Sequence, residues 1–331
     1  MTEKSEVPRD TLPSPSAPVS GAFANKAVPY LLILPVVLYY AAFWFRPVIT
    51  SVIGSFTDPN GQFTLQNFVM VFTEKNFAPA VRNTAVIVIF SVTLEFVVAL
   101  LLALLINRKF TGSSFFLFLS MVPMALPAAA AGAMWITGLT AHGWLNSLLY
   151  YLGILAEGKK IYWLAGSELS LLALIIVLDA WQVIPSVMII LLAGLQNIPD
   201  EMKEAGYVFG GDYLTVLRKI TLPLLKPTIQ TAVILRLISA IQIWLIVVTL
   251  LGFSRLPVLV ERIVFYHEEV SGLAISYPMA LGYTVIVSVI VSLAAFAYLQ
   301  VSGAFKRDKT PQGGASAERA AAKPSAEKVG A

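Results

Sequence analysis

Charged residues are scarce in this sequence, and cysteine is absent. Asp, Glu, Lys and Arg make up 13% of the 331 residues, whereas a soluble domain of this size needs about 25% to cover its surface. Without cysteine the chain has no disulfide, thiolate metal site or cysteine nucleophile. The two histidines, His142 and His267, argue against a histidine-based metal site. These shortages exclude several enzyme classes and are typical of a membrane protein.

Apolar residues dominate and are gathered into long blocks. They make up 57% of the chain, with a mean hydropathy of +0.78. Six blocks are long enough to cross about 30 Å of hydrocarbon at about 1.5 Å per residue, and they run over 28–52, 84–106, 115–138, 169–195, 228–252 and 277–302. The sequence therefore predicts an all-α, polytopic membrane protein with six transmembrane helices. It shows no internal repeat of the kind found in many secondary transporters.

The two ends of the chain are polar. Residues 1–27 are rich in proline and serine, and residues 303–331 are of low complexity, so both are predicted to be disordered tails. The first apolar block is too long for a signal peptide. With the amino terminus inside, the predicted cytoplasmic segments hold more than twice as many Lys and Arg residues as the predicted outer loops, 53–83, 139–168 and 253–276. This bias predicts that both termini are cytoplasmic.

The polar loop between the fourth and fifth predicted spans has the signals of a helix and a hinge. Pro199 suits a first helical turn, and Asp200 and Glu201 complement the positive end of a helix. This helix is predicted through Met202–Phe209 and to stop at Gly210–Gly211, where a positive φ is available.

Beyond the hinge, Asp212 is placed to cap a second short helix that ends before Leu222–Pro223. On physical grounds alone, residues 196–227 also fit a folded, solvated loop without a partner, because length and a hinge do not identify one. The identities of the residues separate these alternatives.

The loop resembles the EAA loop of ABC-importer permeases, whose pattern is IPxExxEAA, then DGA, then IxLP and a later proline. The matching positions are Ile198-Pro199, Glu201, Glu204-Ala205, Gly210, Ile220 and Leu222-Pro223. In that family the loop forms a coupling helix in a cleft of the cytoplasmic ATPase. The resemblance implies an ATPase-coupling role for Glu201, Glu204, Ala205, Gly206, Phe209, Gly210, Gly211, Leu222 and Pro223.

Three positions depart from the family pattern. Gly206 replaces the third alanine, Phe209 replaces the aspartate, and Gly211 replaces the alanine after the glycine. We expect Phe209 to meet the ATPase or to pack under the hinge.

The resemblance extends over about residues 28–302 and specifies the sugar-uptake class, of the maltose and trehalose type. Its motifs include FTLQNFVMVF, the outer-loop stretch GWLNSLLYYLG with Gly143, Asn146 and Gly153, and VLDAWQVIPSVMIILLAGLQNIP. The stretch LGFSRLP at 251–257 departs from the GGP-containing turn of many relatives.

The resemblance implies a heterodimeric permease in the inner or plasma membrane of a prokaryote. Its partners would be a second homologous permease, two ATPase subunits, an extracytoplasmic binding protein and a sugar, with no nucleic acid. ATP and Mg would be bound by the ATPases, while this chain would hold no cofactor and perform no bond chemistry. The expected substrate is a di- or oligosaccharide such as trehalose or maltose. The alternatives are a polyol or glycerol phosphate permease, or a proton-coupled secondary transporter using Glu95 or Asp179.

Three charges, Glu95, Asp179 and Arg236, lie within predicted spans. A charge at the bilayer centre costs about 2.5–3.5 kcal/mol on insertion scales, so each needs a cavity or a partner. Asp179 shares a helical face with Gln182, and Arg236 shares one with Ser239.

Two interpretations of these charges remain open. These faces can line a sugar route, with Trp181 and Trp244 offering flat apolar surface to the sugar ring. Alternatively, Arg236 braces the helices by pairing with Glu95 or Asp179, or the charges face the partner permease.

The segment 153–160, GILAEGKK, partly matches a P-loop. Lys160 stands where a Ser or Thr would hold Mg²⁺, and the segment lies in a predicted outer loop. We therefore expect no nucleotide site in this chain, so that any ATP-derived energy comes from another subunit.

Overall fold

The computed structural model describes residues 28–58, 60–273 and 275–303. Its elements are helices, joined by turns and one isolated antiparallel bridge between Thr57 and Phe63. The chain divides into two units between Gly54 and Ser55. The predicted tails 1–27 and 303–331 lie outside the described residues, apart from Gly303.

The first unit is the helix that the first apolar block predicts. It comprises α1 (Val28–Tyr40), a π-helical turn (Ala41–Phe45) and α2 (Arg46–Ser55), which ends at the first residue of the second unit. The rings of Tyr39 and Phe43 lie 5.2 Å apart, on successive turns across the join. The stretch Tyr30–Ser55 is long and apolar enough to cross a membrane.

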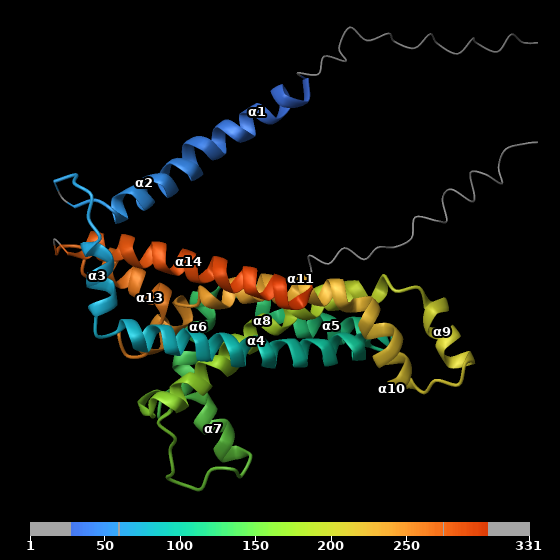
Figure 1. The fold of residues 1–331 in the computed structure, drawn as a ribbon. Coiled ribbons are helices and arrows are strands. Elements are labelled where there is room, and N and C mark those ends of the chain that lie inside the picture. Colours follow the sequence, from blue (N-terminus) through green and yellow to red (C-terminus); the bar gives the residue numbers. More distant parts are fainter. Residues whose placement is uncertain (1–27, 59, 274, 304–331) are drawn as a thin grey trace, which may run out of the picture. The chain divides into compact units, whose positions relative to one another are not determined.

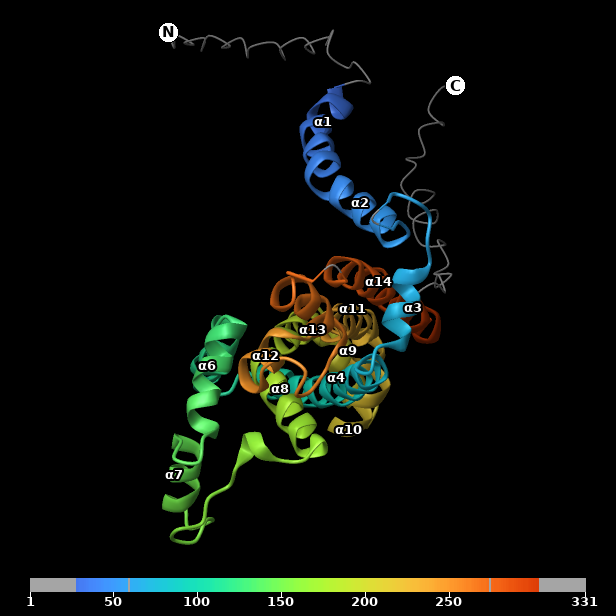
Figure 2. The same cartoon turned by 90° about the vertical axis from the view of Figure 1, so that its left-hand side faces the viewer.

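Long helices lying side by side form the body of the second unit (Figure 1). They are α4 (Phe77–Asn107), α8 (Glu168–Gln196), α11 (Leu222–Ile241) and α14 (Ser276–Ser302). α4 packs along α8, and α11 lies against α4, α8 and α14, as the nearly end-on view shows (Figure 2). Small α4 residues such as Ala99 and Ala103 are buried against the α8 side chains Met188 and Leu191, so the two helices approach closely.

The predicted span 115–138 is not one straight helix. It consists of α5 (Ser113–Met121), a 3₁₀ turn (Val122–Ala125) and α6 (Ala128–Leu139), with a bend of 93°. Pro127 ends the first part, because proline has no N–H and disfavours helical geometry in the residue before it. A count of six spans therefore depends on this bent pair being one span, and the other five are long helices.

The fifth span also differs from the prediction. Its helix continues α10 (Tyr213–Val216) through a π-helical turn (Leu217–Thr221) into α11, and ends at Ile241 rather than near residue 252. The second loop helix is therefore not separate, and Pro223 does not end it. The N–H of Leu222 bonds to the carbonyl of Leu217, so the π-helical turn shifts the hydrogen-bond register just before the proline.

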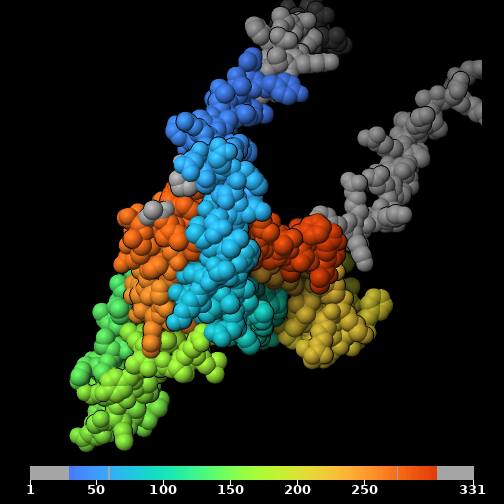
Figure 3. Space-filling model, turned by 60° about the vertical axis from the view of Figure 1, so that its left-hand side comes forward, coloured from blue at the N-terminus to red at the C-terminus, as the bar shows by residue number. Residues whose placement is uncertain are grey.

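Segments predicted as outer loops contain short helices. These are α3 (Gln66–Thr73), α7 (Trp144–Tyr151), a 3₁₀ turn (Trp163–Ala165), α13 (Leu259–Val264) and a π-helical turn (Phe265–Glu269). Another short helix, α12 (Leu245–Leu251), occupies the end of the predicted fifth span, 228–252. α12 packs on α6, and Gly132 of α6 lies so close that an added Cβ would be 2.7 Å from Thr249 Cγ2. α3 lies beside α13 and α14 (Figure 3).

Candidate functional site

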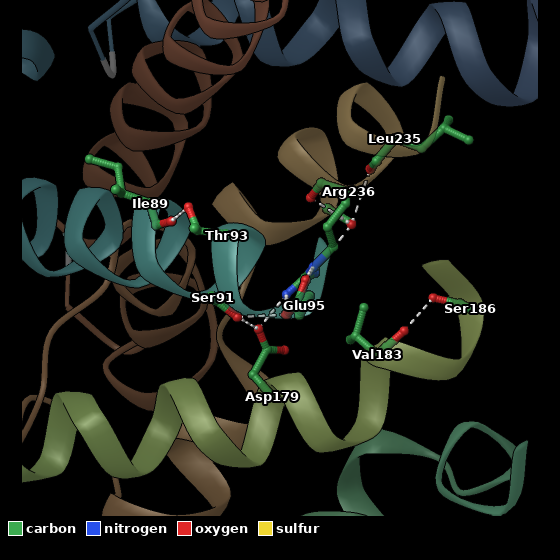
Figure 4. Close-up of polar contacts among 10 residues, drawn as sticks. Ile89, Ser91, Thr93, Glu95, Asp179, Val183, Ser186, Leu235 and Arg236 are labelled. Carbon is green, nitrogen blue, oxygen red and sulfur yellow. Dashed lines mark hydrogen bonds and ion pairs between the residues drawn. The ribbon is translucent and has the colours of Figure 1, made fainter. Parts of the chain in front are cut away.

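The three intramembrane charges meet in one buried cluster. Arg236 reaches from α11 to Glu95 on α4 and to Asp179 on α8 (Figure 4). Its Nη2 donates to Glu95 Oε1 at 2.8 Å, and its Nε donates to Glu95 Oε2, which makes a two-pronged contact. Ser91 Oγ lies 2.6 Å from Glu95 Oε1 and 2.7 Å from Asp179 Oδ2. We call Ser91, Glu95, Asp179 and Arg236 the Arg236 cluster.

The burial of this cluster favours the bracing interpretation. The side chain of Glu95 is fully buried, and those of Asp179 and Arg236 are 10% and 8% exposed. Buried charges are tolerated when they are paired and hydrogen-bonded, and here one guanidinium serves two carboxylates from two other helices. The cluster therefore fastens α4, α8 and α11 together at one level.

The other predicted pathway residues surround two interruptions of the helices. Gln182 Nε2 donates to the carbonyl of Leu126 at 2.8 Å, next to the bend at Pro127. Trp244 stands in the break between α11 and α12, with φ −156° and ψ −45°. Trp181 is half-buried and packs edge-to-face on Trp135, with ring centroids 5.4 Å apart.

Ser239 is exposed and lies one turn from Arg236. Its hydroxyl accepts from Arg236 Nη1 at 3.3 Å and donates to the carbonyls of Leu235 and Arg236. Gln242, which the sequence analysis did not single out, is an exposed polar residue at the end of α11. Its position three residues after Ser239, on the same helical face, was its only sequence signal.

The predicted coupling residues lie on and after α9 (Asp200–Val208). The helix starts at Asp200, directly after Pro199, and Asp200 and Glu201 occupy its first turn, as predicted. It ends in a Schellman motif, in which Gly211 N–H bonds to Gly206 O at 3.0 Å and Gly210 N–H bonds to Tyr207 O at 2.9 Å. Gly210 has a φ of +82°, which a glycine adopts without strain.

The three departures from the family pattern have distinct surroundings. A Cβ on Gly206 would lie 2.6 Å from Ile220 Cδ1, and one on Gly211 would lie 2.8 Å from Gly206 O. These two glycines thus let α9 pack closely on α10 and the turn after it. Phe209 is 91% exposed, so of its two predicted alternatives packing under the hinge is wrong, and contact with the ATPase stays a prediction.

The remaining coupling residues divide into exposed and packed groups. Glu201, Glu204 and Ala205 are exposed on α9, and Pro223 is exposed at the start of α11. Leu222 packs against the buried cluster that includes Leu191 and Leu225.

The connection after α9 is held by short-range contacts. Asp212 Oδ1 accepts from Thr215 N at 3.1 Å, so Asp212 caps α10 as predicted. Hydrogen bonding by the Thr215 hydroxyl and by its backbone N–H holds the pKa of the Asp212 carboxyl below the usual range. The guanidinium of Arg108, from the predicted cytoplasmic segment 107–114, lies 4.7 Å from the ring centre of Tyr213.

A second buried polar cluster was missed by sequence reasoning, which placed all of its members except Tyr283 in outer loops. Arg262 on α13 is 1% exposed and lies 3.4 Å from Glu74 Oε1, while its Nη1 donates to Ser254 Oγ at 2.7 Å. Tyr283 of α14 donates its hydroxyl to Glu74. Burial, helped by the nearby Glu74 carboxylate, raises the pKa of Tyr266 to about 12. The cluster ties α3, α13 and α14 together.

No group of three or more His, Cys, Asp and Glu side chains suited to a metal ion occurs in the described ranges 28–58, 60–273 and 275–303. His142 and Lys160 lie side by side, and neither contacts the Arg236 cluster in the hydrogen bonds of the described residues.

The known proteins that this chain resembles are membrane components of transport systems. A sequence model of the family described as "Binding-protein-dependent transport system inner membrane component" matches residues 95–306. The trehalose/maltose transport system permease protein MalF of Thermococcus litoralis is 29% identical over 288 residues, covering 84% of this chain and 94% of that protein. The trehalose transport system permease protein SugA of Mycobacterium tuberculosis is 26% identical, covering 75% of this chain and 78% of that protein.

A solved structure shares the fold. A chain of a bacterial alginate ABC transporter, crystallised with an alginate pentasaccharide-bound periplasmic protein, superposes with a TM-score of 0.75. It is 19% identical and covers 86% of this chain and 96% of that chain. The matched family region contains α8, α9 and α11, and it begins at Glu95.

Proposed function

Because the chain belongs to the family of binding-protein-dependent transport system inner membrane components, we propose that it is the permease subunit of an ATP-driven carbohydrate importer. The proposed substrate is a di- or oligosaccharide such as trehalose or maltose. The observation that carries the proposal is the likeness to a trehalose/maltose permease over 84% of this chain, together with the family match across 95–306.

The distribution of Lys and Arg supports the proposed orientation, and the family membership supports the proposed assembly. Both termini lie in the cytoplasm, which places α9 on the cytoplasmic side. A second, homologous permease completes the route, an extracytoplasmic binding protein delivers the sugar, and two ATPase subunits bind ATP and Mg²⁺. This chain performs no bond chemistry.

Coupling is proposed to run from α9 to the Arg236 cluster along one helix. α9 contacts the turn Leu217–Thr221 through Gly206, and the helix Tyr213–Ile241 continues from there without a break to Arg236. When ATP binding closes the ATPase dimer, a displacement of α9 therefore moves α11 as a lever. The Arg236 cluster makes α4 and α8 move with α11, which opens the route outward.

The substrate route is proposed to pass along the interrupted helices rather than through the Arg236 cluster. Ser239 and Gln242 offer exposed polar groups at the end of α11, and Gln182 adds an amide beside the bend at Pro127. Trp181 and Trp244 supply aromatic surface, and aromatic faces suit the C–H side of a sugar ring. Glu95 and Asp179 are occupied by Arg236, which leaves them a bracing role.

Copurification and reconstitution test the proposal. A tagged chain expressed with its neighbours should copurify with an ATPase and a second permease. In proteoliposomes, uptake of labelled trehalose or maltose should require ATP inside and the binding protein outside. Transport by this chain alone, without ATPase, would contradict the proposal and favour the proton-coupled alternative. The ligand retained by the binding protein decides between a sugar, a polyol and glycerol phosphate.

A further inference from the structure

The outward face of α9 has two chemically different halves. Glu201, Glu204, Ala205 and Val208 are spaced i, i+3, i+4 and i+7, so they share one face of the helix, and all four are exposed. The first half carries two carboxylates, and the second half is apolar and continues into Phe209. Among the described residues, neither Glu201 nor Glu204 has an ion-pair partner.

The apolar half is held away from the rest of the protein by the backbone. Val208 and Phe209 are 84% and 91% exposed, although both are large apolar residues. The Schellman bonds of Gly210 and Gly211 fix the turn directly after Phe209, and Gly206 on the opposite side is packed against Ile220. The backbone that carries Phe209 is therefore held in place, so that only the side chain has to be ordered when a partner covers it.

We propose that Phe209 determines which ATPase binds this permease, because the Phe209 side chain requires an apolar pocket in the ATPase cleft. This inference rests on the proposed function, and it names the chemistry of the partner. A cleft suited to the outward face carries basic groups opposite Glu201 and Glu204, and an apolar pocket lined by aliphatic or aromatic side chains opposite Val208 and Phe209. Complementary charge fixes the direction in which the helix lies, and burial of Phe209 supplies selectivity.

A polar group at this position would not fit that pocket. Where the related loops carry an aspartate, this chain carries a phenylalanine with no polar atom in its side chain. An ATPase that presents a basic group here would leave that group buried and unpaired against Phe209. Such a mismatch disfavours the wrong partner, whereas the matched partner gains from removing both apolar surfaces from water.

The test compares three variants with the wild-type chain in the complete complex. Tagged wild-type, Phe209→Asp, Phe209→Leu and Tyr151→Asp chains are coexpressed with the second permease and the cognate ATPase. The amount of ATPase retained per permease is then measured after washes at low and high salt. Tyr151→Asp is the matched control, because Tyr151 is an 82% exposed aromatic residue on α7, far along the sequence from α9.

We expect Phe209→Asp to lower ATPase retention by about tenfold or more, which corresponds to about 1.4 kcal/mol. Phe209→Leu should stay within about twofold of wild type, since it keeps apolar contact, and Tyr151→Asp should not change retention. Unaltered thermal stability of the permease pair would show that Phe209→Asp folds. Retention of the ATPase by Phe209→Asp at the wild-type level would overturn the inference. Failure of the wild-type chain to bind any ATPase would instead overturn the proposed function.

Discussion

Replacing Arg236 by methionine removes the only cation of the Arg236 cluster while keeping a long side chain in its place. Glu95 and Asp179 would then face each other across a buried site, with Ser91 as their shared hydrogen-bond partner. Removing one partner of a buried ion pair costs about 3–5 kcal/mol, because the remaining charge is left uncompensated. Here two carboxylates lose their partner, so the upper part of that range is expected.

The neutral variants separate charge from packing. Glu95→Gln leaves Arg236 paired with Asp179 and should cost less, about 1–3 kcal/mol, as expected for a buried hydrogen-bond partner. The triple variant Glu95→Gln/Asp179→Asn/Arg236→Met removes every charge of the cluster. It should recover much of the stability lost in Arg236→Met, since replacing a whole buried ion network is often near neutral. This non-additivity is the signature of a network.

Reversible unfolding in mixed micelles, followed by tryptophan fluorescence, measures these differences. Thr231→Ala is the control, because Thr231 is exposed on the same helix and its hydroxyl donates to the carbonyl of Pro227, away from the Arg236 cluster. If Arg236→Met unfolds within about 1 kcal/mol of wild type, far below the expected cost, the cluster is not a brace. In that case, a changed pattern of competing sugars in uptake assays would place Arg236 on the substrate route instead.

Three other perturbations test separate parts of the structure. Gly211→Ala should destabilise by about 1–3 kcal/mol, since its new methyl group would meet Gly206 O at 2.8 Å, and an unchanged melting temperature would contradict the tight turn that ends α9. Gln182→Met should lower the free energy of unfolding by about 1–3 kcal/mol, because it leaves the carbonyl of Leu126 without its donor. The same unfolding assay measures this loss, and an unchanged free energy would show that another group satisfies the carbonyl. Burial raises the pKa of Glu261 above its ordinary value of 4.5, so the folded protein disfavours the ionised carboxylate. The free energy of unfolding should therefore fall as the pH rises from the ordinary pKa to the raised one. Glu261→Gln should remove that part of the slope in melting temperature against pH, and an identical slope in both proteins would refute the assignment.

The α9 region shows how far local signals reach. Pro199, Asp212 and the glycines at 210–211 each influence only the backbone a few residues around them. Their positions therefore predict where the helix lies, where it ends and which residue caps the next helix. The structure agrees to within about two residues. The same reasoning failed at Pro223, because the π-helical turn before it shifts the hydrogen-bond register, so that the helix continues through the proline. By contrast, no local pattern told whether Phe209 is packed under the hinge or, as the structure has it, exposed.

The sequence by itself determined the membrane class, the long helices and the presence of three charges that need partners, because hydropathy and burial cost depend on residue type. Tertiary structure alone decided that Arg236 pairs with both Glu95 and Asp179, which lie 141 and 57 residues away. It also decided that Arg262 is buried with Glu74 rather than solvated in an outer loop. Such pairings depend on how helices distant in the chain are set against one another, and this follows from packing the whole bundle rather than from any single segment.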